Sequence, residues 1–414
     1  MASTAVAPEF LSVDAARKRV LAAAIPVGEL EIPVLDAVGR ALTKPVVAAH
    51  ALPPFRNSSM DGFAVRSAEA ARWLALGETV PAGHAPLHPL ESGTAARIMT
   101  GAMLPIGADA VVPYEQAELA AGIAGERVRA RESVLPGQNV RDAGRDLAAG
   151  DVALESGREI SPHDLALLVA LGVTRVAVAR RPRAAVISTG DELLDPGAPL
   201  RPGAIRDSNL PMLAALLAEA GCEVARARRT SDRPQEVAAA VREAFDTADL
   251  VLTIGGVSAG DFDPVKLSLD SLGGIALWRV AMKPGRPQAF GRVGERLFFG
   301  LPGNPASVAC VFEVLVRPAL RKLQGFTTLD RPRLEARAAV EIESRAGRTD
   351  FVRVELTRRL GDWWATPAGE QVSGHLTPQA RAHALLEIPE WAERLERGER
   401  ASAMILRWPE NRPA

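Results

Sequence analysis

The chain has 414 residues, of which 47% are hydrophobic and 24% are charged, and its formal net charge is −1. This length is more than one compact core usually holds, so the sequence predicts about two to four domains. The small net charge provides no broad basic surface, and the 4% of aromatic residues leave few side chains on which bases could stack. Nucleic acid is therefore not expected as a partner.

The cysteines and the N-terminal sequence favour a cytoplasmic protein. Cys222 and Cys310 are the only cysteines, and neither forms a CxxC pair nor has a metal-like histidine spacing. Both follow apolar residues, which predicts buried structural thiols. The opening MASTAVAPEF lacks the basic and apolar regions of a signal peptide, and no segment resembles a membrane span. We therefore expect a reducing compartment and no contact with a membrane.

The first half of the chain predicts a helix followed by a small β-rich region. Apolar residues recur at helical spacing over residues 11–25. From residue 51 to about 150, proline and glycine separate short β-like runs such as GFAVR, AARIMTG and DAVVPYEQ. Residues 162–180 then predict a helix closed at Gly172 and a strand. The following Arg-Arg-Pro indicates a domain boundary near Arg181.

The second half alternates apolar strands with amphipathic helices. Strands are expected at AAVIST, CEVARA, DLVLTI and RLFFGL, and helices at NLPMLAALLAEAG, PQEVAAAVREAFDTA, PVKLSLDSLG and PASVACVFEVLVRPALRKLQ. Nearly continuous apolar strands between helices predict an α/β domain with a doubly wound parallel sheet. From Pro332 onward the alternation of apolar and polar residues predicts a final all-β unit.

Three loops rich in glycine and acidic residues each follow one of these strands: STGDEL, GGVSAGDFD and GLPGNP. Since parallel strands end at one edge of a sheet, acids and glycine backbones should meet there. The residues concerned are Asp191, Glu192, Gly255, Gly256, Ser258, Gly260, Asp261, Asp263, Gly300, Pro302, Gly303 and Asn304. Carboxylates suit Mg²⁺, and glycine backbones allow a bulky anion to approach. The alternative is that the glycines form tight turns and the acids cap the next helix.

A basic loop, Lys283-Pro284-Gly285-Arg286-Pro287, could bind a small oxyanion, because its prolines restrict the backbone around two cations. Surface cations near turns usually have no specific ligand, so this loop by itself decides little. The same holds for the loops that carry Asp61, Thr100 and Asp146, which by themselves are more often structural than catalytic.

The ordered motifs SSMDGFA, IMTGAMLP, GQNVRDAGRDL, STGDEL, IRDSN, GGVSAGDFD, KPGRP and GLPGNPAS resemble the MoeA-type molybdopterin molybdenumtransferases, a family that includes a domain of gephyrin. The resemblance implies an elongated homodimer of four-domain chains. It implies a discontinuous linker domain (7–28, 46–54 and 147–180), a small β-rich domain (29–45 and 55–146), a doubly wound, MogA-like molybdopterin-binding catalytic domain (181–328) and a C-terminal β-barrel (329–414).

The resemblance also implies a reaction in which molybdenum from molybdate enters adenylylated molybdopterin and AMP is released with Mg²⁺. Asp61, Thr100 and Asp146 match positions that line the cleft, and Glu192, Asp232 and Asp263 match acidic positions of the catalytic domain. Asp232 and Asp263 are the metal candidates. Lys283, Arg286, Pro287 and Ser307 match positions for molybdate or phosphate, as do Arg353 in DFVRV and Ser373 in QVSG.

Two positions depart from the common family pattern. Arg286 stands where many relatives carry lysine, and Arg145 stands before Asp146 where many carry glutamate. Transient contacts with a molybdopterin adenylyltransferase and with molybdoenzyme-maturation proteins are also expected. The rivals are a nucleotide-hydrolysing enzyme with the same central domain, which would lack SSMDGFA and GQNVR, and a receptor-clustering scaffold, for which no additional linker is visible.

Overall fold

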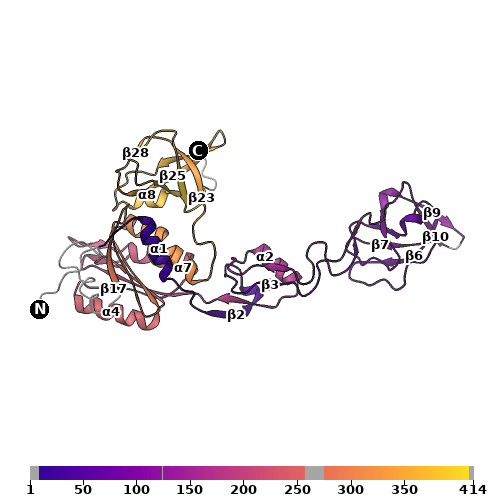
Figure 1. Cartoon of the computed structure of the whole chain (residues 1–414), viewed down its shortest axis with the longest axis horizontal. Coiled ribbons are helices and arrows are strands. Elements are labelled where there is room, and N and C mark those ends of the chain that lie inside the picture. The colour runs from indigo at the N-terminus through magenta and orange to yellow at the C-terminus, as the bar shows by residue number, and fades with distance from the viewer. Residues whose placement is uncertain (1–8, 124, 257–274, 410–414) are drawn as a thin grey trace.

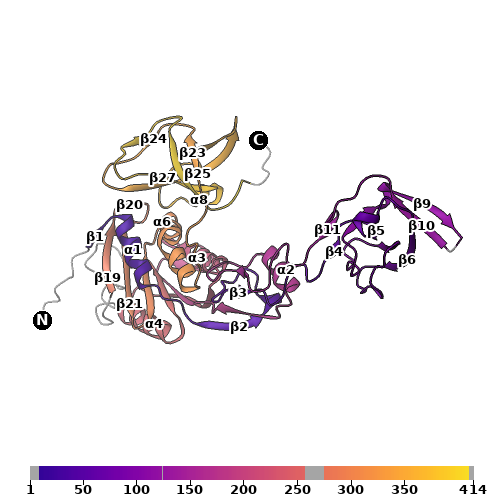
Figure 2. The same cartoon turned by 45° about the vertical axis from the view of Figure 1, so that its right-hand side comes forward.

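The computed structural model describes residues 9–123, 125–256 and 275–409. The molecule is elongated (Figures 1 and 2): a sheet domain and a barrel lie at one end, a small β domain lies at the other, and a narrow linker domain joins them. No helix in the described ranges is long and apolar enough to cross a membrane. The expected multidomain α/β class is confirmed.

The sheet domain is built on four neighbouring parallel strands in the order β22 (Arg296–Leu301), β18 (Leu250–Ile254), β14 (Arg183–Thr189) and β17 (Glu223–Thr230). All five residues of β18 are buried, as expected for a strand covered by helices on both faces. These are the four strands that the sequence predicts, so the parallel core of the fold is confirmed.

The sheet is wider than predicted. β21 (Pro287–Val293) pairs antiparallel with both β22 and β19 (Ile275–Val280), and β1 (Glu9–Leu11) pairs parallel with β19. The complete sheet is therefore mixed. Its antiparallel part carries the basic loop between β19 and β21.

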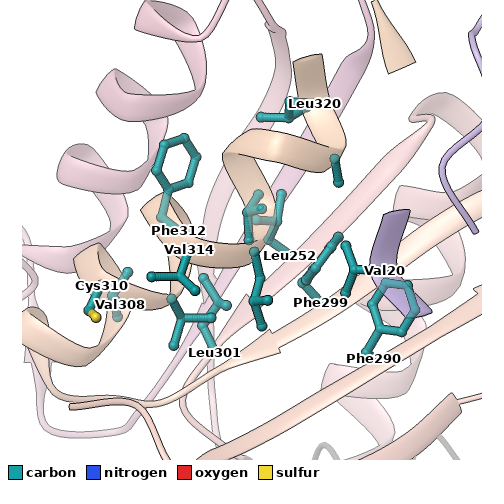
Figure 3. Packing of buried hydrophobic residues seen from close by; sticks show 14 of the residues in the cluster. Val20, Leu252, Phe290, Phe299, Leu301, Val308, Cys310, Phe312, Val314 and Leu320 are labelled. Carbon is teal, nitrogen blue, oxygen red and sulfur yellow. The ribbon is translucent and has the colours of Figure 1, made fainter. Parts of the chain in front are cut away.

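Helices cover both faces of the sheet. α1 (Val13–Ala23), α3 (Asn209–Glu219), α6 (Pro305–Val311), the π-helical turn η4 (Phe312–Val316) and α7 (Arg317–Leu323) pack on one face, and α4 (Pro234–Thr247) packs on the other. Figure 3 shows Phe299 of the sheet beside Val20 of α1, and Leu301 of the sheet beside Val308 and Val314 of α6 and η4. Cys222 and Cys310 are buried free thiols, as predicted, and burial raises the pKa of Cys222 to about 12.

The N-terminal segment packs with the sheet domain, which corrects the expected assignment of residues 7–28 to the linker domain. Ala16 and Val20 of α1 are fully buried in the main core, and the Val27 amide donates to the Leu323 carbonyl at 3.0 Å. The physical reason is the apolar stripe of α1, which is covered by α7 and η4.

A second correction concerns residues 29–45, which were expected in the small β-rich domain. β2 (Glu29–Pro33) pairs with β13 (Arg175–Ala179), and β3 (Val46–Val47) pairs with β12 (Val152–Leu154). Val34, Leu42 and Leu168 share a core with these strands; Leu168 lies on α2 (Pro162–Ala170) and Val34 on the short turn η1 (Val34–Asp36). Residues 29–45 therefore belong to the linker domain.

The small β domain is a six-stranded sheet in the order β8, β5, β7, β6, β10, β9. The strands are β5 (Gly62–Val65), β6 (Leu74–Val80), β7 (Thr94–Ile98), β8 (Ala110–Pro113), β9 (Ala117–Gly122) and β10 (Gly125–Ala130), with the turns η2 (Ser67–Glu69) and η3 (Tyr114–Gln116). β4 (Asn57–Ser58) and β11 (Val140–Arg141) pair at the junction with the linker.

The C-terminal unit is a closed five-stranded barrel. Its strands are β23 (Arg333–Ala338), β25 (Thr349–Arg359), β26 (Asp362–Pro367), β27 (Ala384–Ile388) and β29 (Arg400–Ile405), and the pairing of β25 with β27 closes it. β24 (Ile342–Glu343) pairs with β28 (Arg394–Leu395), and α8 (Leu376–Arg381) follows β26. β20 (Met282–Lys283) of the sheet domain pairs with β25.

Candidate functional site

The loops after β14 and β22 meet the described start of the loop after β18, Gly255 and Gly256, at one edge of the sheet, as predicted. β14, β18 and β22 are direct neighbours, with Ile187 opposite Thr253 and Thr253 opposite Gly300. The loops that follow them line a cavity of about 790 Å³, which we call the acidic cavity. Its walls include Thr189, Gly190, Glu192, Arg206, Asp207, Asn209, Asp232, Gly255, Gly256, Gly303, Asn304 and, from the barrel side, Gly374 and Leu376, so that acids outnumber the one cation among these described residues.

The acidic wall comes from the loops after β14 and β17. The Asp191 amide donates to the Asp232 carboxylate at 3.2 Å, and the Asp232 amide donates to the Asp191 carboxylate at 3.4 Å. These two reciprocal hydrogen bonds hold the two loops together, and Glu192 and Asp232 line the cavity. Asp191, Glu192 and Asp232 make no ion pair with any described residue.

Glycine is needed where the β18 loop crosses the end of β14. Gly255 has a φ of +85°, and a Cβ there would lie 3.1 Å from Thr189 Oγ1. The Gly255 amide donates to the Leu301 carbonyl at 3.0 Å, and Asn209 Nδ2 donates to the Gly303 carbonyl at 2.6 Å. A small residue at position 255 therefore lets the start of the β18 loop pass close to Thr189 while it bonds to the end of β22, and α3 holds the loop after β22 through Asn209.

Several buried polar atoms at this cavity have no hydrogen-bond partner. They are Ser188 Oγ, Asp207 Oδ2 and Asn209 Oδ1, and all three residues line the cavity. An unpaired buried polar group costs about 1–3 kcal/mol, which a bound ligand could offset. Asp207 and Asn209 belong to the motif IRDSN, whose sequence alone predicts no role for either residue. The sequence signal is weak because Asp207 Oδ1 also caps α3, accepting from the Asn209 and Leu210 amides at 3.1 and 3.0 Å.

A second cavity, of about 960 Å³, lies beside the first and is rich in cations. Lys283 and Arg286 line it together with Pro287, Ser307 and Ser373, and we call it the cationic cavity. Asn304 borders both cavities. Neither Lys283 nor Arg286 forms an ion pair or side-chain hydrogen bond in the described part of the chain, so both charges remain available to an anion.

The basic loop is held by both the sheet domain and the barrel. Met282 and Lys283 pair in parallel with Thr349 and Asp350 of β25. On the other side, the buried Gln288 donates to the Gly285 carbonyl at 2.7 Å. These contacts fix the main chain around both cations.

Arg353 lies behind the loop that carries Ser373 and does not line either cavity. The side chain is only 2% exposed. Its guanidinium donates to Gln371 Oε1 and to three main-chain carbonyls of residues 370, 372 and 375, at 3.0–3.3 Å. Burial lowers its pKa. Arg353 therefore positions the loop that carries Ser373, whose carbonyl accepts from the Ala306 amide at 3.1 Å.

Pro302 also lies outside the lining of both cavities. It is buried between β22 and α6. Its restricted backbone instead shapes the turn that leads to Gly303 and Asn304.

Asp61 precedes β5 and Thr100 follows β7 in the small β domain, and Asp146 follows β11 at the junction of this domain with the linker. The sheet domain and the barrel, whose residues line both cavities, lie at the other end of the molecule (Figure 2). Asp61 accepts hydrogen bonds from the Thr100 amide at 2.6 Å and from its hydroxyl at 2.7 Å. These bonds lower the pKa of Asp61, the side-chain bond most strongly. Asp146 lies with Arg141 and Arg145 at a separate cavity of about 530 Å³. One chain therefore does not assemble the whole predicted set.

The described residues fit a magnesium site only in part. Glu192 and Asp232 offer the carboxylate oxygens that this hard cation prefers. However, the described ranges contain no group of three or more His, Cys, Asp or Glu side chains arranged to hold a metal. The candidates Ser258, Gly260 and Asp263, and the neighbouring Asp261, lie outside the described residues.

Family models match nearly the whole chain. Residues 11–172 match the MoeA N-terminal region (domain I and II), residues 185–322 match a probable molybdopterin binding domain, and residues 335–406 match the MoeA C-terminal region (domain IV).

Individual relatives agree with this result. Molybdopterin molybdenumtransferase 2 of Mycobacterium tuberculosis is 39% identical over 374 residues, covering 87% of this chain and 91% of the relative. Molybdopterin molybdenumtransferase of Haemophilus influenzae is 38% identical over 349 residues, covering 83% and 85%. The crystal structure of a molybdopterin biosynthesis MoeA protein from Pyrococcus horikoshii OT3 matches 96% of this chain and 100% of that chain, with a TM-score of 0.82 and 28% identity. The chain therefore belongs to the family of MoeA-type molybdopterin molybdenumtransferases.

Proposed function

We propose that this chain is an enzyme of molybdenum cofactor biosynthesis that transfers molybdenum from molybdate to adenylylated molybdopterin and releases AMP. The observation that carries the proposal is the junction of two oppositely charged cavities at Asn304. A substrate with a phosphate chain and a separate oxyanion would occupy both at once. Bringing two reactants together in a fixed geometry removes much of the entropic barrier to their reaction.

In this proposal the acidic cavity binds the nucleotide part of the pterin. The small residues Gly255, Gly256 and Gly303 let the main chain approach phosphate oxygens, and Ser188 and Asn209 supply unpaired polar atoms. Mg²⁺ held by Asp232 and Asp263 would neutralise charge on the phosphate oxygens. Glu192 lines the same wall and would orient water or a metal-bound group.

The cationic cavity would bind molybdate. Lys283 and Arg286 can donate charge-assisted hydrogen bonds to a tetrahedral dianion, and these are stronger than neutral ones. Ser307 is only 4% exposed, and it also lines the cationic cavity. Arg286 in place of lysine keeps the charge but presents a planar fork, so the anion would be held in a more directional way.

The separation of Asp61, Thr100 and Asp146 from both cavities supports a homodimer in which the small β domain of a second copy completes each site. The side chain of Asp61 is exposed and its pKa is lowered, so it would be an anion at neutral pH. We further propose that the reaction occurs in the cytoplasm, with transient delivery from a molybdopterin adenylyltransferase and transfer to molybdoenzyme-maturation proteins.

The test combines two measurements on the purified full chain. Adenylylated molybdopterin, Mg²⁺ and molybdate are added, and AMP release and the reconstitution of an apo-molybdoenzyme are followed together. Both should require molybdate and be abolished by a chelator of Mg²⁺. Failure to release AMP under these conditions, or AMP release without any active molybdoenzyme, would contradict the proposed transfer.

A further inference from the structure

The loop formed by residues 344–348 of the barrel reaches the cationic cavity and is tightly held there. The Ser344 amide donates to the Glu393 carbonyl at 2.8 Å, and the Gly347 amide donates to the Glu390 carbonyl at 2.6 Å. The next residue, Thr349, donates its amide to the Ala281 carbonyl at 2.9 Å. The loop is thus fastened to the barrel at one side and to the basic loop of the sheet domain at the other.

The two arginines of this loop have different surroundings. Arg348 donates from Nε and Nη2 to the two carboxylate oxygens of Asp350, at 2.7 and 3.3 Å, and Asp350 is only 3% exposed. The positive charge of Arg348 is therefore already neutralised by Asp350. Arg345 is exposed, lines the cavity, and has no ion pair or hydrogen bond from its side chain to any described residue.

The cationic cavity has more positive than negative side chains in its lining. Lys283, Arg286 and Arg345 are unpaired, while Glu390 is the one acidic residue among the described residues of the lining. Clustered like charges repel one another and concentrate a field that attracts an anion. Of the two other cations in the described lining, Arg348 is paired with Asp350, and Arg279 lies over the ring of Phe10 at 5.5 Å.

We propose that Arg345 is a further oxyanion-binding residue, so that the anion is held between the basic loop of the sheet domain and the 344–348 loop of the barrel. This inference rests on the proposed function for the location of molybdate. It assigns to the barrel a contact through Arg345, which lines the cavity, whereas Arg353 does not. A guanidinium that has no protein partner keeps all its donors for a tetrahedral dianion.

Two consequences follow from an anion shared by two domains. Loss of the Arg345 charge should weaken binding without changing the fold, because the side chain makes no internal bond. A charge-assisted hydrogen bond contributes about 1.5–3 kcal/mol when well shielded, and solvent exposure reduces it, so a loss of about three- to tenfold in affinity is expected. Anion binding should also stabilise the sheet domain and the barrel together.

The test measures molybdate binding to the full chain by isothermal titration calorimetry, with no pterin present. Arg345→Gln should raise the Kd for molybdate about three- to tenfold, and Arg345→Lys should recover part of the loss. The matched control is Arg397→Gln, which removes an exposed, unpaired charge from the same barrel but away from the cavity. Arg397→Gln should leave the Kd unchanged.

A thermal scan with and without molybdate provides the second readout. The wild-type Tm should rise with molybdate, and the rise should be smaller in Arg345→Gln while the Tm without molybdate stays the same. Equal Kd values for Arg345→Gln and wild type, or an equal loss in Arg397→Gln, would overturn the assignment. The outcome is separate from the proposed function: a chain that binds molybdate through Arg345 but releases no AMP would contradict the reaction and leave this contact intact.

Discussion

Gly285 offers a sharp test of whether the conformation of the basic loop determines anion binding. Its φ is +110°, and a Cβ at this position would lie 2.5 Å from Val311 Cγ2 of α6. Gly285→Ala should therefore add backbone strain of about 1–2 kcal/mol. The close contact with a packed side chain should add about 1–3 kcal/mol more. The loop must move, and the bond from Gln288 to the Gly285 carbonyl should weaken.

Gly294 provides a matched control in the turn between β21 and β22. It also has a positive φ, +61°, but a Cβ there would meet nothing within 4 Å. Gly294→Ala should cost about 1 kcal/mol through backbone strain alone. The difference in free-energy cost between Gly285→Ala and Gly294→Ala isolates the contribution of the steric contact. A difference of about 1.4 kcal/mol corresponds to a tenfold change in an equilibrium constant.

Hydrogen exchange by mass spectrometry measures the effect locally. The Val280 amide donates to the Arg286 carbonyl at 2.9 Å, so peptides covering residues 280–288 should exchange about tenfold or more faster in Gly285→Ala. The molybdate concentration for half-maximal AMP release should rise in parallel. Identical exchange and identical molybdate dependence in the two alanine variants would refute the claim that Gly285 positions the cations.

Three further predictions address single charges and the second copy of the chain. Lys283→Ala should raise the half-maximal molybdate concentration about tenfold while changing pterin binding little, and an unchanged requirement would exclude this loop from the anion site. Thr100→Val should raise the pKa of Asp61, measured by NMR, because it removes the hydroxyl hydrogen bond that lowers this pKa most. The stability lost in that variant should appear above about pH 4 and vanish as pH falls through the lowered pKa of Asp61, so a constant loss at all pH values would contradict this cause. Inactive Asp61→Asn and Asp232→Asn chains should partly restore activity when mixed and allowed to exchange, whereas no recovery after proven exchange would place both residues in one chain's site.

The sequence predicts the parallel core because local patterns determine it. β14, β18 and β22 are short apolar runs that end in glycine-rich loops, and adjacency of the three loop ends follows from the fold class. The hairpin of β19 and β21 was missed because its strands flank the KPGRP motif, which reads as a loop, and because they vary in burial along their length. No local sequence pattern indicates that antiparallel strands extend the edge of a parallel sheet.

Long-range pairing explains both corrections to the domains. β2 pairs with β13 across more than a hundred residues of intervening chain, and no local pattern in residues 29–45 specifies that partner. The helix α1 was recognised, but its apolar stripe could equally have faced the linker domain. Only the packing of Val20 in the main core decides between the two.

The orientation of side chains, which a sequence motif does not show, explains why the sequence predicts the site only in part. A motif can place Arg353 near the anion, but it cannot show that its donors are used by carbonyls of the 370–375 loop. Conversely, Arg345 and Asp207 carry no distinctive sequence signal. Their significance comes from the cavities that they line and from the polar atoms that remain unpaired.

The arrangement of charges around Asn304 explains how one site could accept two different anions. Carboxylates and guanidinium groups that share a cavity normally pair, and paired groups would be unavailable to substrate. Here, in the linings that the structure describes, Glu192, Asp207 and Asp232 outnumber the single cation Arg206 in one cavity, and the cations outnumber the single acid Glu390 in the other. No ion pair joins the two cavities among the described residues. Asn304, which is neutral, borders both. The acids can therefore hold a cation against a phosphate chain while the bases hold a free oxyanion next to it, which is the charge distribution that the proposed transfer requires.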